Sequence, residues 1–262
     1  MRREVYAIAK KNLFIFLSYK FHASLKIFTI LVIIVTSFIA IPYFSIRFNL
    51  KDYRFFFISG IIFGNYVLPV LRYFSQLIEE EKKLGTLEAL IVLPTNLIII
   101  IISTYIWSFI SISVISLPVL IFGLYLLKVK FYIQTFLAII SIFILSIILF
   151  STIAIMLSGF IIAFEKGEFI TNFVINILSL FGNIYLPIAF LPKILQKFSY
   201  YLPITYGVNA FRKILFGNYT TLDIVYDLII LSVFFLILWP LSIFILKFSL
   251  MNAKKKGSLS HY

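Results

Sequence analysis

Residues 131–164 read FYIQTFLAIISIFILSIILFSTIAIMLSGFIIAF, without a single charged side chain. A helix that crosses the hydrocarbon core of a bilayer needs about 20 apolar residues, and a longer one crosses with a tilt. The whole chain has the same character, because 62% of its 262 residues are hydrophobic and only 13% are charged. In soluble domains roughly a quarter of the residues are charged. The composition therefore predicts a helical membrane protein and argues against a soluble enzyme.

Charges and prolines divide the chain into six apolar segments, each of which we expect to cross the membrane as a helix. The predicted spans are residues 27–46, 55–78, 97–124, 134–164, 169–191 and 228–246. Residues 1–26 place lysines between apolar side chains, which predicts a helix lying in the membrane interface. We thus expect an all-α polytopic membrane protein with one transmembrane domain, residues 1–262.

Residues 193–222 form an apolar segment that is expected to enter the membrane and return. Only 14 residues separate Lys197 from Arg212, which is too few to cross a core of about 30 Å. Pro203 and Gly207 interrupt the segment further. Irregular backbone at membrane depth is tolerated where protein buries it or where it lines a cavity.

The formal net charge of +13 does not indicate a nucleic-acid partner here. The Lys and Arg residues that give this charge flank the apolar segments, where they contact lipid headgroups and orient the protein. A modest excess of basic residues on the inner side predicts a multi-pass protein of the cell membrane with both termini in the cytoplasm. Arg72 lies inside the second predicted span, from which its guanidinium is expected to reach the interface.

The polar segment between the second and third predicted spans, which we call the elbow, carries the strongest functional pattern. Gly85 permits a bend, and Thr86 can cap a short helix over residues 87–93. Leu87, Leu90 and Ile91 then fall on one face of that helix. The pattern fits either a docking contact for a partner or an ordinary interfacial loop helix. The candidate residues of the elbow are Glu81, Gly85, Thr86, Leu87, Glu88, Leu90, Ile91 and Pro94.

The fifth predicted span carries polar residues at helical spacing. Asn172, Asn176, Ser179 and Asn183 fall at i, i+4, i+7 and i+11, on one face of a helix. Exposing three amides to lipid would be unfavourable, so this polar stripe is expected to face protein or a cavity. It either lines a substrate pathway or forms hydrogen bonds at a packed helix interface.

Two segments resemble known motifs. Residues 81–90, EKKLGTLEAL, followed by Pro94, resemble the signature of ABC-2 type transporter permeases, from which Lys83 and Leu84 depart. Residues 202–206, LPITY, with a following Arg and Gly, are similar to a second block of that family, in which they form an external re-entrant hairpin before the sixth span. The matched residues of this block are Pro203, Thr205, Tyr206, Arg212 and Gly217.

The resemblance implies a half-transporter that exports its substrate. Two permeases, identical or paralogous, would form the pathway, and each elbow would be a cytosolic coupling helix docked on one of two copies of a separate P-loop ATPase. The resemblance also favours a pathway lined by the polar stripe. This chain has no Gly-x-x-x-x-Gly-Lys-Ser/Thr motif, so ATP and Mg would be bound by the partner and no cofactor by this chain. No catalytic or metal-ligating residue is expected.

Two other classes of membrane protein, a head-group transferase and a gradient-driven carrier, are alternatives to a permease subunit. A membrane-embedded lipid head-group transferase would need carboxylates or histidines at membrane depth, whereas the ten acidic residues lie at span ends and in loops. A gradient-driven carrier would need a buried charged residue for coupling, and an inverted repeat is typical of such carriers. Neither feature is visible in the sequence.

Overall fold

The computed structural model describes residues 24–25, 28–32, 35, 53–83, 110, 112–113, 116–125, 127, 133–163, 167–216 and 221–256. Within these ranges every regular element is a helix, so the prediction of an all-α protein is confirmed for them. The elements are α3 (Tyr53–Lys83), α6 (Ile133–Ala163), α7 (Gly167–Phe181), the short 3-10 helix η1 (Ile188–Phe190), α8 (Lys193–Tyr200), α9 (Pro203–Phe216) and α10 (Thr221–Lys256).

Three helices are long and apolar enough to cross a membrane. Their candidate spans are Phe55–Arg72 in α3, Ile133–Ala163 in α6 and Ile224–Asn252 in α10. These helices overlap the second, fourth and sixth predicted spans. The first and third predicted spans, 27–46 and 97–124, lie mostly outside the described residues, and the interfacial helix 1–26 almost entirely so. The six-span topology therefore stays a prediction.

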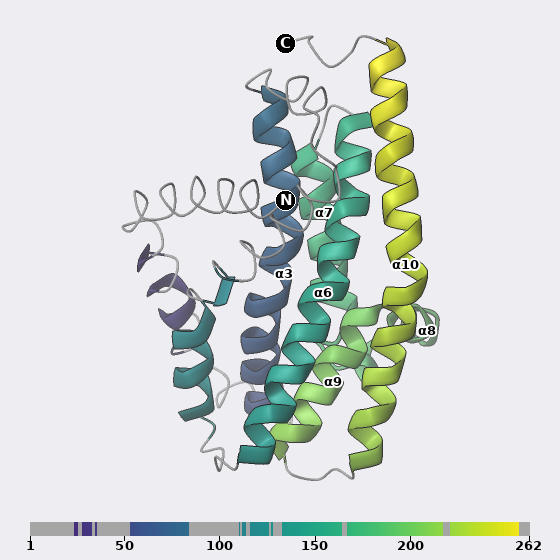
Figure 1. Ribbon diagram of the computed structural model, residues 1–262. Coiled ribbons are helices and arrows are strands. Elements are labelled where there is room, and N and C mark those ends of the chain that lie inside the picture. The colour runs from purple at the N-terminus through teal and green to yellow at the C-terminus, as the bar shows by residue number, and fades with distance from the viewer. Residues whose placement is uncertain are drawn as a thin grey trace.

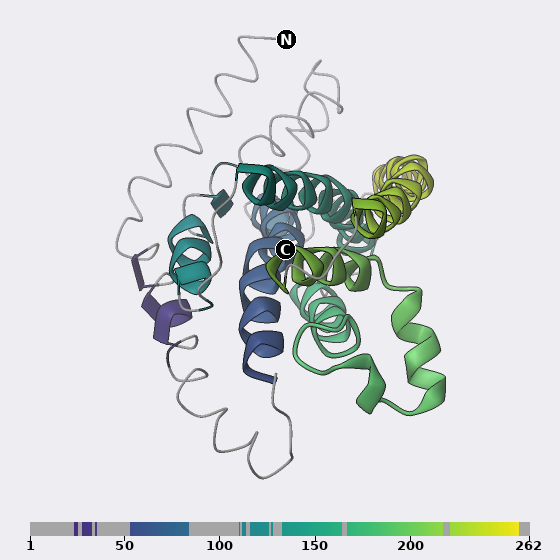
Figure 2. The same ribbon diagram turned by 90° about the horizontal axis from the view of Figure 1, so that it is seen from below.

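The three long helices run in the same direction, and α7 runs in the opposite direction packed against α3 and α6 (Figure 1). The C-terminal ends of α3, α6 and α10 consequently lie at one end of the bundle, and α9 lies in the opposite half. Helix α6 packs against both α3 and α10. Figures 1 and 2 show α8 projecting from the side of the bundle next to α9.

The expectation that the fifth helix runs to Leu191 is wrong. Helix α7 ends at Phe181, and the backbone of Asn183 adopts a φ of 62°, in the left-handed region that an α-helix does not use. Pro187 and Pro192 then flank η1 and keep the chain from resuming α7. Apolar composition continues through this loop, which is why the sequence suggested a longer helix.

The core is aromatic where α3, α6 and α9 meet. The ring centres of Phe63 and Phe143 are 5.5 Å apart, and Phe211 lies 5.8 Å from the first and 5.3 Å from the second. Tyr66 adds a fourth ring 4.4 Å from Phe143. Buried aromatic groups at these separations attract one another beyond the burial of their area. This cluster fixes α9 against the two long helices.

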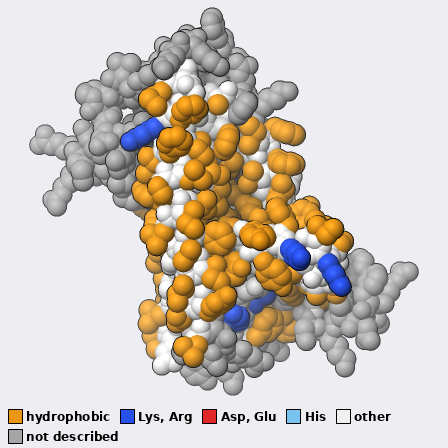
Figure 3. Space-filling view, turned by 90° about the vertical axis from the view of Figure 1, so that its right-hand side faces the viewer, with side chains coloured by type: hydrophobic (Ala, Val, Ile, Leu, Met, Phe, Trp, Pro, Cys, Tyr) orange, Lys and Arg blue, Asp and Glu red, His pale blue; other side chains and the backbone are white. Residues whose placement is uncertain are grey.

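The outer face of α10 is apolar along its length. Only 11% of its candidate span is buried, and Figure 3, which views this side, shows hydrophobic side chains over most of the face. Leu236, Ile237 and Phe244 are each more than 60% exposed. A surface of this kind is typical of a helix that faces lipid or a further protein.

Candidate functional site

Arg212 of α9 is buried against α3 and against the loop that follows α7. Its Nε donates to Ser59 Oγ at 3.1 Å, and its Nη1 donates to the Asn183 carbonyl oxygen at 2.6 Å. Its Nη2 donates to the carbonyl oxygens of Phe56 at 2.8 Å and Ile184 at 3.1 Å. The guanidinium carbon also lies 3.5 Å from the centre of the Phe56 ring. We call Arg212 and these four partners the arginine hub.

The arginine hub holds a cation without a carboxylate. Arg212 is 6% exposed, and in the described part of the chain its hydrogen bonds all go to neutral oxygens. An arginine guanidinium is not deprotonated in proteins, so this buried group keeps its charge. The carbonyl dipoles and the Phe56 ring supply the stabilisation that water would otherwise give.

Gly60 makes the approach of α3 to this loop possible. A Cβ atom at residue 60 would lie 2.0 Å from the Ile184 carbonyl oxygen and 2.8 Å from Arg212 Nη2. Real Cβ atoms do not come so close to a backbone oxygen, so any larger residue would push the loop and the guanidinium away from α3. The hub thus depends on a glycine as much as on its arginine.

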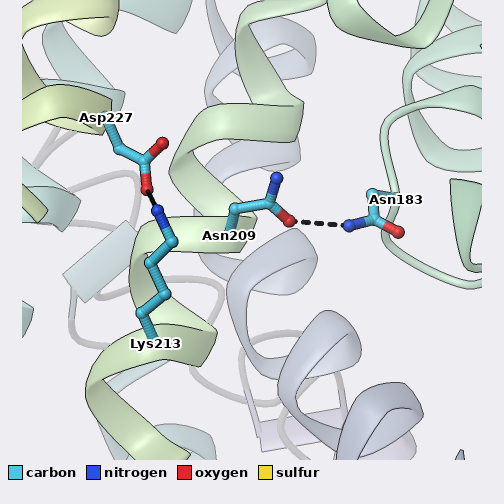
Figure 4. Close-up of polar contacts among 4 residues, drawn as sticks. All are labelled: Asn183, Asn209, Lys213 and Asp227. Atoms are coloured by element: carbon cyan, nitrogen blue, oxygen red, sulfur yellow. Dashed lines mark hydrogen bonds and ion pairs between the residues drawn. The ribbon is translucent and has the colours of Figure 1, made fainter. Parts of the chain in front are cut away.

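Asn183 belongs to the connection between the loop and α9, and not to the polar stripe of α7. Its Nδ2 donates to Asn209 Oδ1 at 2.7 Å (Figure 4). Its Oδ1 accepts a hydrogen bond from the Ile188 backbone N–H at 3.3 Å. The prediction that Asn183 continues one helical face is wrong, because α7 has already ended at Phe181. The side chain instead orders the loop beside Arg212.

The other three residues of the stripe have different environments. Asn172 Oδ1 accepts a hydrogen bond from Arg72 Nη2 at 3.0 Å, which joins α7 to α3. Asn176, one turn later, is exposed. Ser179 is buried and donates to the Ile175 carbonyl oxygen of its own helix at 2.7 Å. Only Asn172 and Asn176 are therefore placed to present amide groups outside the core.

The hairpin made by α8 and α9 is held by polar contacts at its turn. Pro203 is the buried first residue of α9. Thr205 Oγ1 donates to the Ser199 carbonyl oxygen at 2.7 Å, and the Tyr206 hydroxyl donates to the Tyr200 carbonyl oxygen at 2.9 Å. These bonds fix the start of α9 on the end of α8. Gly217, the last candidate of this block, lies outside the described residues.

An ion pair connects α9 to α10. Lys213 Nζ lies 2.7 Å from Asp227 Oδ2 (Figure 4), and the Asp227 side chain is only 5% exposed. Lys213 follows Arg212 directly, so neighbouring cations of α9 contact different segments: one binds the α3 side and the other binds α10. Helix α9 is thereby fixed on both sides by charged groups.

The elbow is mostly outside the described residues. Glu81 lies in the last turn of α3, and the structure describes only its backbone. The other candidates, Gly85, Thr86, Leu87, Glu88, Leu90, Ile91 and Pro94, fall in the range 84–94 that the structure does not describe. The coupling helix therefore stays a prediction from the sequence.

Several residues of these contacts were not singled out by the sequence. Asn209 lies three residues before Arg212, on the same face of α9, and this spacing could have marked it. Gly60 is followed by Gly64, a spacing that allows backbones to approach closely between membrane helices. Ser59 and the bond between Arg72 and Asn172 carry no local signal, because their partners are far away in the sequence.

The comparisons with known proteins point to one family. The family model described as "ABC-2 type transporter" matches residues 70–216. The matched range starts within α3, includes the elbow, α6, α7 and α8, and ends with the last residue of α9. No curated protein sequence matches this chain.

Proposed function

This chain belongs to the ABC-2 type transporter family, and we propose that it forms half of an export pathway that a separate ATPase drives through the elbow. The family match extends over residues 70–216, which is more than half of the 262 residues. Members of the family are membrane-embedded transport permeases that normally work with a separate ATPase subunit. The match thus favours transport over a head-group transferase or a gradient-driven carrier.

One structural observation carries the coupling proposal: α3 connects the elbow to the arginine hub. Lys83, next to the elbow, ends α3, and Phe56, which binds Arg212, lies 27 residues earlier. At 1.5 Å per residue these two points are about 40 Å apart along the helix axis. A push on the elbow would tilt α3 and, through the hub, displace α9 in the opposite half of the bundle. Such a lever would link ATP hydrolysis to the mouth of the pathway.

The complete transporter in this proposal contains two permeases and two ATPase subunits in the cell membrane. The second permease is either a copy of this chain or a paralogue, and ATP with Mg binds to the ATPase subunits. Both termini and the elbow face the cytoplasm, and the α8–α9 hairpin faces outside. The common end of α3, α6 and α10 in Figure 1 supports this arrangement, because the last residues of α3 and α10, Lys83 and Lys256, lie on one side.

Asn172 and Asn176 are the residues of the polar stripe that we assign to the pathway. Both lie on α7 with amide groups outside the core, whereas Ser179 and Asn183 are used in internal contacts. In this role Asn176→Leu changes which compounds are exported while association with the ATPase is retained. Unchanged export of every compound tested would reduce the stripe to packing.

Co-purification with the ATPase tests the docking role of the elbow. The chain is tagged and expressed with the P-loop ATPase encoded beside it, and the complex is isolated in mild detergent. Leu87→Asp combined with Leu90→Asp is expected to abolish association, because both changes charge the predicted docking face. Ala89→Asp, on the opposite face of the predicted helix, is the matched control and keeps the ATPase. Retention of the ATPase by the Leu87 and Leu90 variant would contradict the proposal.

A further inference from the structure

Arg72 presents unused hydrogen-bond donors on the apolar part of α3. It is the last residue of the candidate span Phe55–Arg72 and lies 11 residues before the end of α3 at Lys83, about 16 Å along the axis. Its side chain is exposed, and its single hydrogen bond in the described structure is the one to Asn172. A guanidinium carries five N–H donors. Most of these donors therefore point away from protein acceptors.

The bond between Arg72 and Asn172 leaves N–H donors on both side chains. The amide oxygen of Asn172 accepts from Arg72 Nη2 at 3.0 Å, so its amide NH₂ group is left to donate to another molecule. The two side chains together offer a positive charge and several N–H groups. That combination complements an oxyanion, to which charge-assisted hydrogen bonds are the strong ones.

The same face of α7 combines these donors with exposed aromatic rings. Phe169 is 71% exposed and Phe173 is 56% exposed, with ring centres 6.3 Å apart and an interplanar angle of 12°. Asn172 and Asn176 lie between and beside these rings on the helix. The surface therefore suits a molecule that has an anionic group and an apolar part.

Two acidic residues lie on the same helices as this cluster. Glu79 is seven residues farther along α3 than Arg72, which is about 10 Å, and Glu168 is one turn before Asn172 at the start of α7, where the structure describes only its backbone. In the described part of the chain no carboxylate forms an ion pair with Arg72. A cation at this depth is unfavourable when it faces hydrocarbon alone. An anionic ligand would supply the missing partner.

We propose that Arg72, Asn172 and Asn176 bind the anionic group of an amphiphile, whose apolar part lies against Phe169 and Phe173. The anionic group is a phosphate, sulfate or carboxylate. The assignment of this amphiphile as the transported substrate rests on the proposed function, whereas its binding at the cluster does not. Entry from the inner half of the membrane follows from the position of Arg72 on the elbow side of α3.

Equilibrium binding of radiolabelled dodecyl phosphate to the purified full chain in phosphatidylcholine nanodiscs tests the site. Saturable binding is expected, with dodecanol and inorganic phosphate each binding at least about tenfold more weakly. Arg72→Gln is expected to raise the dissociation constant at least about tenfold, the loss of one charge-assisted hydrogen bond. Arg72→Lys keeps the charge and recovers part of the affinity. Lys193→Gln, an exposed cation at the start of α8, is the matched control and leaves binding unchanged.

Three results would overturn the site: equal affinity in Arg72→Gln and wild type, an equal loss in Lys193→Gln, or dodecanol binding as tightly as dodecyl phosphate. Should Arg72→Gln fail to fold, Asn176→Leu gives the test, because it removes donors without touching the bond to Asn172. If inorganic phosphate bound as tightly as dodecyl phosphate, the apolar part would contribute nothing to affinity. That result would overturn the proposal that the ligand is an amphiphile.

A second arm separates a bilayer lipid from a transported amphiphile as the source of the anion. Nanodiscs in which phosphatidylglycerol replaces part of the phosphatidylcholine are expected to bind dodecyl phosphate as before. Displacement by phosphatidylglycerol would assign the site to a structural lipid and overturn the substrate assignment. Because binding is measured on the permease alone, loss of the ATPase in co-purification would contradict the proposed function without affecting this result.

Discussion

Replacing Arg212 by methionine tests how much the arginine hub contributes to stability. The variant removes the donors to four oxygens while keeping an unbranched apolar side chain in the cavity. The carbonyl oxygens of Asn183 and Ile184 lose a donor in a buried loop, whereas the Phe56 carbonyl lies within α3 and keeps a helical partner. An unsatisfied buried acceptor costs about 1–3 kcal/mol, so two of them cost about 2–6 kcal/mol.

Part of this cost is offset because Arg212→Met also removes a buried charge. Burying a cation costs desolvation free energy, and an apolar replacement removes this cost. We therefore expect a net loss of about 2–4 kcal/mol in the free energy of unfolding. For a chain of this size the apparent melting temperature would fall by about 5–15 °C. The melting temperature is measured by tryptophan fluorescence on the purified protein in detergent.

Lys197→Met is the matched control for Arg212→Met, because Lys197 is an exposed cation on α8. Its melting temperature is expected to stay within about 1 °C of wild type, since exposed charges contribute little. Arg212→Lys supplies three donors from one nitrogen, so its melting temperature is expected to lie between those of wild type and Arg212→Met. A melting temperature of Arg212→Met equal to that of wild type would refute the reasoning, because the hub would then contribute nothing to stability.

Three further perturbations test the contacts around α9. Gly60→Ala places a Cβ 2.0 Å from the Ile184 carbonyl oxygen, so we expect the variant protein to be less stable by about 1–3 kcal/mol in the same melting assay. An unchanged melting temperature would contradict the close approach of α3 to the loop that contains Ile184. In a double-mutant cycle, the stability losses of Lys213→Met and Asp227→Asn are expected to be less than additive by about 1–2 kcal/mol. Full additivity would show that the 2.7 Å contact between these two side chains contributes nothing. Asn183→Ala is expected to be less stable than Asn183→Gly by about 1 kcal/mol, because of these two residues glycine alone adopts a φ of 62° without strain. A higher stability of Asn183→Ala would exclude that backbone conformation.

The long helices could be predicted from the sequence because continuous apolar stretches have one stable form in a bilayer. Backbone groups without water must bond within the segment, and a helix does so without a partner strand. Residues 131–164 therefore predicted α6 (Ile133–Ala163) to within a few residues. The end of α7 could not be placed in this way, since the loop after Phe181 is as apolar as the helix.

The site could be predicted only where its signal was local. The spacing of Asn172 and Asn176 on one face of α7 is visible in the sequence, and so is the break at Pro203. The partners of Arg212 are not, because Ser59 lies 153 residues earlier and Asn183 reaches the hub through a turn of the backbone. Contacts between residues so far apart in the sequence depend on how α3 and α9 pack, and no short motif encodes that packing.

Labelling a thiol in the elbow tests the central claim, that this segment receives force from a cytosolic ATPase. The chain has no cysteine, so Leu90→Cys introduces a single thiol. Leu222→Cys, in the first turn of α10 at the opposite end of the bundle (Figure 1), provides a reference thiol where the native side chain is 77% exposed. A membrane-impermeant maleimide should label residue 222 but not residue 90 in intact cells, and residue 90 but not residue 222 in inverted vesicles. Labelling of residue 90 from outside intact cells would place the elbow on the wrong side of the membrane for any ATPase.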